Sequence, residues 1–129
     1  MRLSWLQLLR VWKWKWLTAN MSRAKGNLAE TKASAFLYDN GFTVIEQNFY
    51  SRFGEIDIIA VKDEVLHFIE VKSGLDYESA IQNITPRKLS RLIKTGDVYM
   101  KKNNLNIDFV YDAVVVTPKD IEMVENITL

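Results

Sequence analysis

The sequence predicts an α/β or α+β domain of three layers, in which helices flank a central mixed sheet. Two observations support this prediction. Helix signals occur twice, once as an apolar stripe before residue 40 and once as a Thr-Pro start at residues 85–86. Short runs rich in β-branched residues lie between and after these two segments. The expected order of elements is α-β-β-β-α-β.

The first helix is expected over residues 23–39. Ser22 is a plausible N-cap, because its hydroxyl can accept a hydrogen bond from a free amide of the first turn. Apolar residues then recur at helical spacing at Ala29, Ala33, Phe36 and Leu37. Asn40-Gly41 supplies the stop signal.

Three strands should follow the helix. The first covers residues 42–49 and is followed by a turn at residues 50–54. Residues 56–61 and 65–72 form a β-hairpin around a short turn at residues 62–64. Both hairpin strands are apolar on both faces, apart from a few charges. Such strands belong in the middle of a sheet that is covered on two sides.

The remainder of the chain supplies a helix and one or two strands. Residues 74–83 indicate a loop or an irregular short helix. Thr85 is a strong N-cap and Pro86 suits the first helical position, so a helix should run to about residue 101. Residues 107–116 predict a buried strand, and residues 121–126 a short last strand.

Composition restricts the possible chemistry. The 129 residues suit one domain, and they include no cysteine and a single histidine, His67. Disulfides, thiolate zinc sites and a cysteine nucleophile are therefore excluded, and a cytoplasmic location is expected. Any metal must be held mainly by oxygen ligands, which favours Mg²⁺ or Mn²⁺.

The first twenty residues differ in kind from the rest. They contain all four tryptophans, four basic residues and no acidic residue, so residues 21–129 carry 13 basic against 16 acidic residues, a net charge of −3. Residues 1–20 are too short and too charged to span a bilayer. The favoured interpretation is that the start codon has been assigned too far upstream, so that residues 1–20 are an artefact and the domain covers residues 21–129. A helix on a membrane surface and an added packing element are the alternatives.

Asp57, Glu70 and Lys72 are the candidate catalytic residues. Glu70 and Lys72 are two apart in a strand and so share a face. The hairpin should place Asp57 roughly opposite Glu70, with the two Cβ atoms about 5 Å apart. Two carboxylates and a lysine together suit a cation site for phosphoryl chemistry. From spacing alone, a buried salt bridge of Lys72 with either carboxylate is the more common explanation.

Several ordered runs resemble a known family. Gly54-Glu55-Ile56-Asp57 followed by Glu70-Val71-Lys72 resembles the D…ExK core of the restriction-endonuclease-like, PD-(D/E)xK, superfamily. The chain resembles more closely the YraN-like family of uncharacterised proteins within it. The matching runs are residues 26–30 with Ala33, residues 54–60, residues 68–72, Thr85, Lys88, Arg91 and residues 111–116.

The resemblance implies a restriction-endonuclease-like fold and a role for each matching residue. Asp57 and Glu70 would be metal ligands, with the Val71 carbonyl and Glu30 as further ligands, and Lys72 would be the catalytic lysine. For Glu30, a solvated charge on the helix face is the alternative. Glu55, two residues before Asp57 and so on the same strand face, either assists the cluster or lies outside it, and the second is the favoured interpretation. The implied activity is a Mg²⁺- or Mn²⁺-dependent endonuclease acting on DNA or a branched nucleic acid. The alternative is a non-catalytic module that retains this fold and binds nucleic acid or a partner.

One departure from the family concerns phosphate affinity. Many relatives carry a Thr-Arg-like continuation after the ExK motif, where this chain has Ser73-Gly74. Lys88, Arg91 and Lys94 could form a phosphate-facing stripe, although a solvated helix face is the more common explanation.

Three aromatic residues near the first turn are candidates for contact with bases. Phe49, Tyr50 and Phe53 could stack on the bases of a single strand. Packing in the core or in the loop is the favoured interpretation for all three.

Overall fold

The computed structural model describes residues 28–128. The expected start of the first helix at residues 23–27 and the proposed extension at residues 1–20 lie outside the described residues. Within them, the predicted fold class and element order are confirmed.

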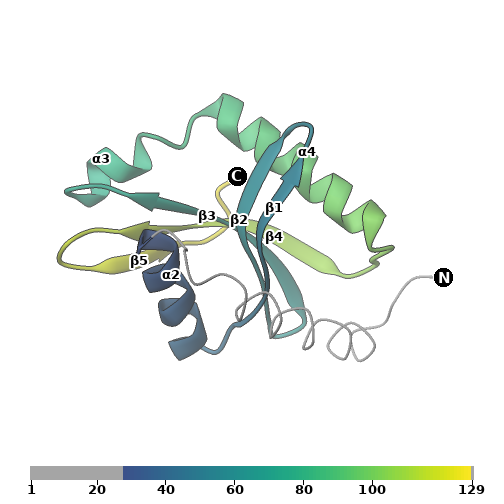
Figure 1. Cartoon of the computed structure of the whole chain (residues 1–129), viewed down its shortest axis with the longest axis horizontal. Helices are drawn as coiled ribbons and strands as arrows, with labels where there is room; N and C mark the ends of the chain where they lie inside the picture. Colours follow the sequence, from purple (N-terminus) through teal and green to yellow (C-terminus); the bar gives the residue numbers. More distant parts are fainter. Residues whose placement is uncertain (1–27, 129) are drawn as a thin grey trace.

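A five-stranded mixed sheet forms the middle layer (Figure 1). Its strands are β1 Thr43–Ser51, β2 Gly54–Lys62, β3 Val65–Ser73, β4 Asp108–Val116 and β5 Ile121–Val124. They lie side by side in sequence order. Every neighbouring pair is antiparallel except β3 and β4, which are parallel. A parallel pair needs a long crossover connection, and the helical segment between β3 and β4 supplies it.

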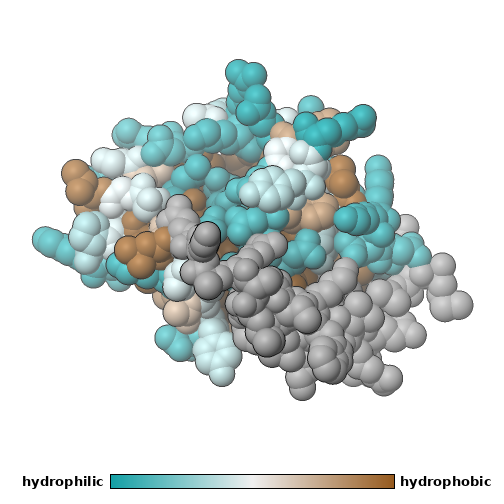
Figure 2. All heavy atoms as spheres, in the orientation of Figure 1, coloured by the Kyte–Doolittle hydropathy of each residue, from teal (hydrophilic) through white to brown (hydrophobic). Residues whose placement is uncertain are grey.

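Helices lie on both faces of the sheet. The described helices are α2 Leu28–Asp39, α3 Tyr77–Ile81 and α4 Pro86–Lys102. Figure 1 shows α2 on one side of the sheet and α4 on the other. Hydrophilic side chains dominate the visible surface along α4 in Figure 2. None of the helices within residues 28–128 is long and apolar enough to cross a membrane.

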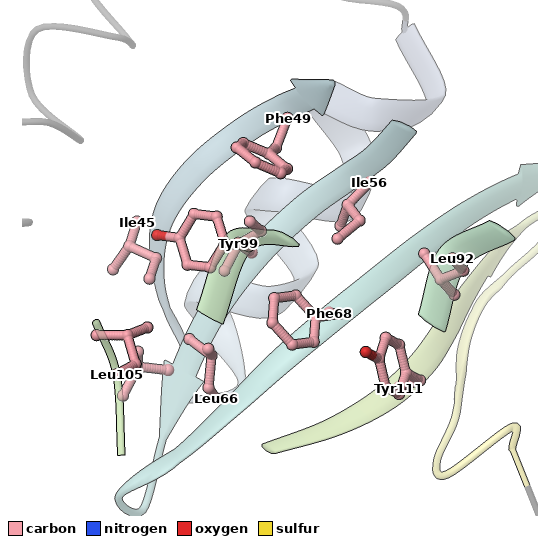
Figure 3. Packing of buried hydrophobic residues seen from close by; sticks show 11 residues of the cluster. Ile45, Phe49, Ile56, Leu66, Phe68, Leu92, Tyr99, Leu105 and Tyr111 are labelled. Atoms are coloured by element: carbon pink, nitrogen blue, oxygen red, sulfur yellow. The ribbon is translucent and has the colours of Figure 1, made fainter. Parts of the chain in front are cut away.

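Each face of the sheet buries its own apolar cluster. The α4 face is centred on Tyr99, whose ring lies edge-on to Phe49 and Phe68 with centroids 5.0 and 5.8 Å away (Figure 3). The α2 face packs Ala33 and Leu37 of the helix against the sheet. Because β2 contributes to both clusters, it is apolar on both faces, as the sequence predicts for a central strand.

Local signals explain where α4 begins. The Thr85 hydroxyl oxygen accepts a hydrogen bond from the Lys88 amide at 3.2 Å, and Pro86 occupies the first turn. Both features favour a helix start. The amides of the first turn have no acceptor within the helix, so the Thr85 hydroxyl supplies one, and proline has no amide N–H that would be left unpaired. The short helix α3, in the segment expected to be a loop or irregular helix, is capped in the same way by Asp76.

In β1 and β2 the regular alternation of side chains between the two faces of the sheet is interrupted near Asp57. Ile56 belongs to the α4-side cluster and Ile58 to the α2-side cluster, although residues two apart in a regular strand share a face. Asn48 lies across from this point in β1, between the partners of those two residues, and has a φ of +54°. Asparagine tolerates this left-handed conformation better than most residues. The reversal turns Glu55 toward the side on which α2 lies.

Candidate metal centre

Three carboxylates converge where the first turn of α2 meets the beginning of β2. Each of Glu30, Glu55 and Asp57 offers a carboxylate oxygen, and these oxygens all lie within 4.8 Å of one another. Two oxygens that bind one Mg²⁺ or Ca²⁺ at 2.0–2.6 Å lie at most about 5 Å apart. The donor set and its spacing therefore fit a single hard cation.

Asp57 is the most buried member of this cluster, with 9% of its surface exposed. Its Oδ2 accepts a hydrogen bond from the Val71 amide at 2.8 Å, which fixes the carboxylate between β2 and β3. Burial and, after it, the negative charge of Glu70 are the main causes that raise the pKa of Asp57 to about 8. The Val71 hydrogen bond lowers the pKa, while contacts with Glu55 and Glu30 add to the rise. A bound cation would offset this repulsion, since opposite charge favours the ionised form.

Glu70 and Lys72 form an ion pair beside this cluster. Lys72 Nζ lies 3.0 Å from Glu70 Oε1, and about a fifth of each side chain is exposed. The two residues border a small hollow on the α4 side of the sheet, together with Ile84, Lys88, Leu89, Leu92 and Ile127. Spacing left open whether Lys72 pairs with Asp57 or with Glu70, and the structure shows the pair with Glu70.

The register explains why Asp57 and Glu70 approach but do not pair. The ladder between β2 and β3 ends at Ile58 and Ile69, one step before Asp57 would lie opposite Glu70. From there the Asp57 carboxylate, in place of a backbone carbonyl, accepts the hydrogen bond of the Val71 amide. The predicted adjacency of Asp57 and Glu70 is visible in the electrostatic effect of Glu70 on Asp57.

The structure groups the predicted ligands differently from the sequence. It brings Glu30 and Asp57 together, and it adds Glu55, which was expected to lie outside the cluster. Val71 takes part through its amide, which donates to Asp57. The position of Glu55 depends on the face reversal in β2, and the signal that could have indicated it is Asn48 within a strand.

The basic residues of α4 lie along its exposed side. Lys88 borders the hollow beside Glu70 and Lys72. Lys94 Nζ lies 5.7 Å from the centre of the Phe53 ring. Arg91 is exposed as well, one turn after Lys88. The stripe thus runs from the Glu70–Lys72 pair toward the turn between β1 and β2.

The aromatic residues near that turn do not share one environment. Phe49 is 6% exposed and belongs to the core, as expected from packing. Phe53 is partly buried, with the Arg52 guanidinium 4.7 Å from its ring centre. Tyr50 is 69% exposed and lies outside the core.

His67 lies at a separate place on the α2 face. Its Nδ1 is 2.5 Å from Oδ2 of Asp112, a carboxylate with no exposed surface. The other oxygen of Asp112 accepts a hydrogen bond from the Asn126 amide at 2.8 Å. The pair therefore ties β3 and β4 to the segment after β5, as a structural contact.

Fold and site together define a mixed-sheet α+β domain with a carboxylate cluster and a neighbouring lysine–glutamate pair. A model of the uncharacterised protein family UPF0102 matches residues 29–116, and the chain belongs to this family. This confirms the predicted relation to a YraN-like family of uncharacterised proteins.

Close relatives support the same membership. The chain is 68% identical over 109 residues to a UPF0102 protein of Sulfurimonas denitrificans, covering 84% of this chain and 100% of the relative. It is 51% identical over 110 residues to a UPF0102 protein of Aliarcobacter butzleri and 52% identical over 109 residues to one of Wolinella succinogenes. Both of these alignments also cover 84% of this chain and 100% of the relative.

Proposed function

We propose that this protein is a Mg²⁺- or Mn²⁺-dependent phosphodiesterase that cleaves nucleic acid with a restriction-endonuclease-like site. The observation that carries the proposal is the convergence of three carboxylate oxygens within 4.8 Å, beside an ion-paired lysine on the neighbouring strand. Carboxylates gathered at this spacing repel one another, so the fold retains them at a cost unless a cation is bound.

Glu30, Glu55 and Asp57 are the residues that would hold the cation. A hard divalent cation supplies polarisation of a phosphoryl oxygen and a lower pKa for bound water. The Val71 amide fixes the orientation of Asp57 through its 2.8 Å hydrogen bond, so this ligand is placed before any metal binds. Glu30 approaches from a different element, and binding would therefore also tie α2 to the sheet.

Lys72 is the residue that would stabilise negative charge on the phosphate in the transition state. Its side chain is mostly buried, and a charge interaction there is stronger than in bulk water. Glu70 keeps the ammonium in place through the 3.0 Å contact. In this role Glu70 positions Lys72 in addition to adding negative charge near Asp57.

Calorimetric titration with MnCl₂ and MgCl₂ tests the metal site directly. Wild type should bind about one ion, and Asp57→Asn should weaken binding by tenfold or more because a buried ligand charge is lost. Glu122→Gln is the matched control, since Glu122 is an exposed acid on β5. Equal titration curves for wild type and Asp57→Asn would refute the metal site.

Cleavage of labelled DNA and RNA tests the reaction. Glu70→Ala and Lys72→Ala should each abolish metal-dependent cleavage while the circular dichroism spectrum and thermal midpoint stay near those of wild type. Wild-type protein that cuts neither DNA nor RNA with either metal overturns the proposal for those substrates.

The Glu70–Lys72 ion pair favours a second candidate function, a non-catalytic module that binds nucleic acid or a partner. In that case the pair serves only to stabilise β3, as a structural salt bridge. Binding would then weaken steeply with salt and be unaffected by Glu70→Ala. Loss of binding on metal removal alone would argue against this alternative.

A further inference from the structure

A cavity of about 360 Å³ lies on the α2 face of the sheet. It opens between the end of α2, the turn that joins β2 to β3 and the residues at the end of β5. None of the three clustered carboxylates lines it. Its volume falls within the range of small-molecule pockets, roughly 300–1,000 Å³. The apolar part of its wall consists of Phe36, Phe42, Val65 and Met123.

His67 brings an available ring nitrogen to this cavity, in addition to its structural contact with Asp112. Both oxygens of the fully buried Asp112 carboxylate act as acceptors, one for Nδ1 of His67 and the other for the Asn126 amide. The proton of the neutral imidazole therefore lies on Nδ1, which leaves a lone pair on Nε2. No group within residues 28–128 forms a hydrogen bond with Nε2. Because the His67 ring borders the cavity, Nε2 is an acceptor that a ligand can reach.

The surroundings of this acceptor favour positive charge. The last turn of α2 carries no basic residue that would offset the partial negative charge of a helix C-terminus. Asp63 and Glu125 are exposed acids on the cavity wall. Lys62 is the one cation among the described lining residues, and its ammonium lies 5.1 Å from the centre of the Phe42 ring. Two acids against one lysine leave the cavity with a net negative charge beside its apolar wall.

We propose that this cavity binds a small organic cation, an ammonium group on an apolar body. The ammonium donates a hydrogen bond to Nε2 of His67 and is attracted by Asp63 and Glu125. The apolar body packs against Phe36 and Met123. This ligand differs from the nucleic acid of the proposed function, because a phosphate ester would meet the two carboxylates and be repelled.

A bare metal ion fits this cavity less well than an organic cation. Within residues 28–128, the only three acidic or imidazole ligands close enough together for one ion are those of the carboxylate cluster. An ammonium needs fewer partners, since one acceptor and nearby negative charge satisfy it while the apolar wall buries the rest of the ligand.

NMR titration of the full chain tests the binding at His67 directly. The chain has a single histidine, so long-range proton–nitrogen correlations give its ring signals without ambiguity. Tryptamine, an ammonium on an indole ring, should move the Nε2 signal and saturate at roughly millimolar concentration. Indoleacetate has the same ring with a negative charge, and it should bind about tenfold more weakly because attraction by the two acids becomes repulsion.

Two exposed acids supply variants that should leave the fold intact. Asp63→Asn and Glu125→Gln should each weaken tryptamine binding about two- to fivefold, the range of an exposed ion pair. Glu64→Gln and Glu122→Gln are the matched controls, since these exposed acids are near in sequence and do not line the cavity. Asp57→Asn should leave the effect of tryptamine unchanged, which separates the cavity from the carboxylate cluster.

Three results on the wild-type protein would overturn the proposed cation site. They are a proton on Nε2 in place of Nδ1, an Nε2 signal that tryptamine does not move, and equal affinities for tryptamine and indoleacetate. Equal affinities of Asp63→Asn and Glu64→Gln for tryptamine would also overturn it, because the attraction by the cavity acids would then be absent. The metal titration with Asp57→Asn is a separate measurement, so the cation site and the metal centre can fail independently.

Discussion

Gly96→Ala provides a sharp test of the packing between α4 and β4. Gly96 is buried in α4, and a Cβ placed there would lie 2.1 Å from the hydroxyl oxygen of Tyr111 and 2.8 and 2.9 Å from two ring carbons. Contacts this short cannot persist, so the Tyr111 ring has to move. Its hydroxyl would then lose the 3.1 Å hydrogen bond that it donates to the Ile93 carbonyl.

The net effect follows from three terms of opposite sign. Alanine is favoured over glycine in a helix interior by about 1 kcal/mol. Overpacking of a core costs about 1–3 kcal/mol, and loss of the hydroxyl hydrogen bond about 1 kcal/mol. The free energy of unfolding should therefore fall by about 1–3 kcal/mol. For a domain of this size each kcal/mol lowers the thermal midpoint by roughly 4–8 °C.

Urea denaturation followed by circular dichroism measures this change. Ser90→Ala is the control, because Ser90 is exposed on the same helix and should show only a small gain in helix propensity. Combining Gly96→Ala with Tyr111→Leu should recover part of the loss, whereas Tyr111→Phe should recover less, because the ring carbons still clash. A Gly96→Ala protein that is more stable than wild type would refute the contact with Tyr111.

Three further predictions concern stability. Thr85→Ala should lower the free energy of unfolding by about 1 kcal/mol through loss of the cap to the Lys88 amide, whereas Thr85→Ser should retain it. Burial raises the pKa of the Tyr111 phenol, so the unfolded chain ionises first and stability should fall as pH rises above about 10. Tyr111→Phe should reduce that slope in pH-dependent urea titrations, and an unchanged slope would contradict the assignment. Asp112→Ala should cost about 2–3 kcal/mol and speed hydrogen exchange at the Asn126 amide, which loses its acceptor; unchanged exchange there would show that this bond does not hold the segment.

Much of the fold was predictable because its signals are local. The cap at Thr85 and the apolar runs of β2 and β3 depend on residues near in sequence, and each produced the expected element. The lengths differ at the first hairpin, where β1 extends to Ser51 and β2 begins at Gly54. Residues next to the turn pair with each other, which lengthens both strands. This extra pairing depends on the register of β1 against β2, and composition does not reveal the register.

The site was predictable in part. Glu30 and Asp57 meet as the family resemblance implies. The inclusion of Glu55 was the less favoured of two interpretations, and in the structure it accompanies the face reversal opposite Asn48. The choice of Glu70 as the partner of Lys72 depends on where the β2–β3 ladder ends. Both outcomes depend on a departure from regular strand geometry, and a period-two pattern assumes that no such departure occurs.

The parallel pairing of β3 with β4 has a consequence for the order of folding. The pairs β1–β2 and β2–β3 join neighbours through tight turns, whereas pairing of Val65 with Asp108 closes a loop that contains all of α3 and α4. Contacts of high sequence separation form slowly, because loop entropy is lost before the contact forms. The three carboxylates and Lys72 all lie before residue 74, ahead of α3 and α4. We therefore expect the three-stranded meander to form first and the Lys88–Lys94 stripe to reach the site only when α4 docks, which hydrogen-exchange pulse labelling during refolding would resolve.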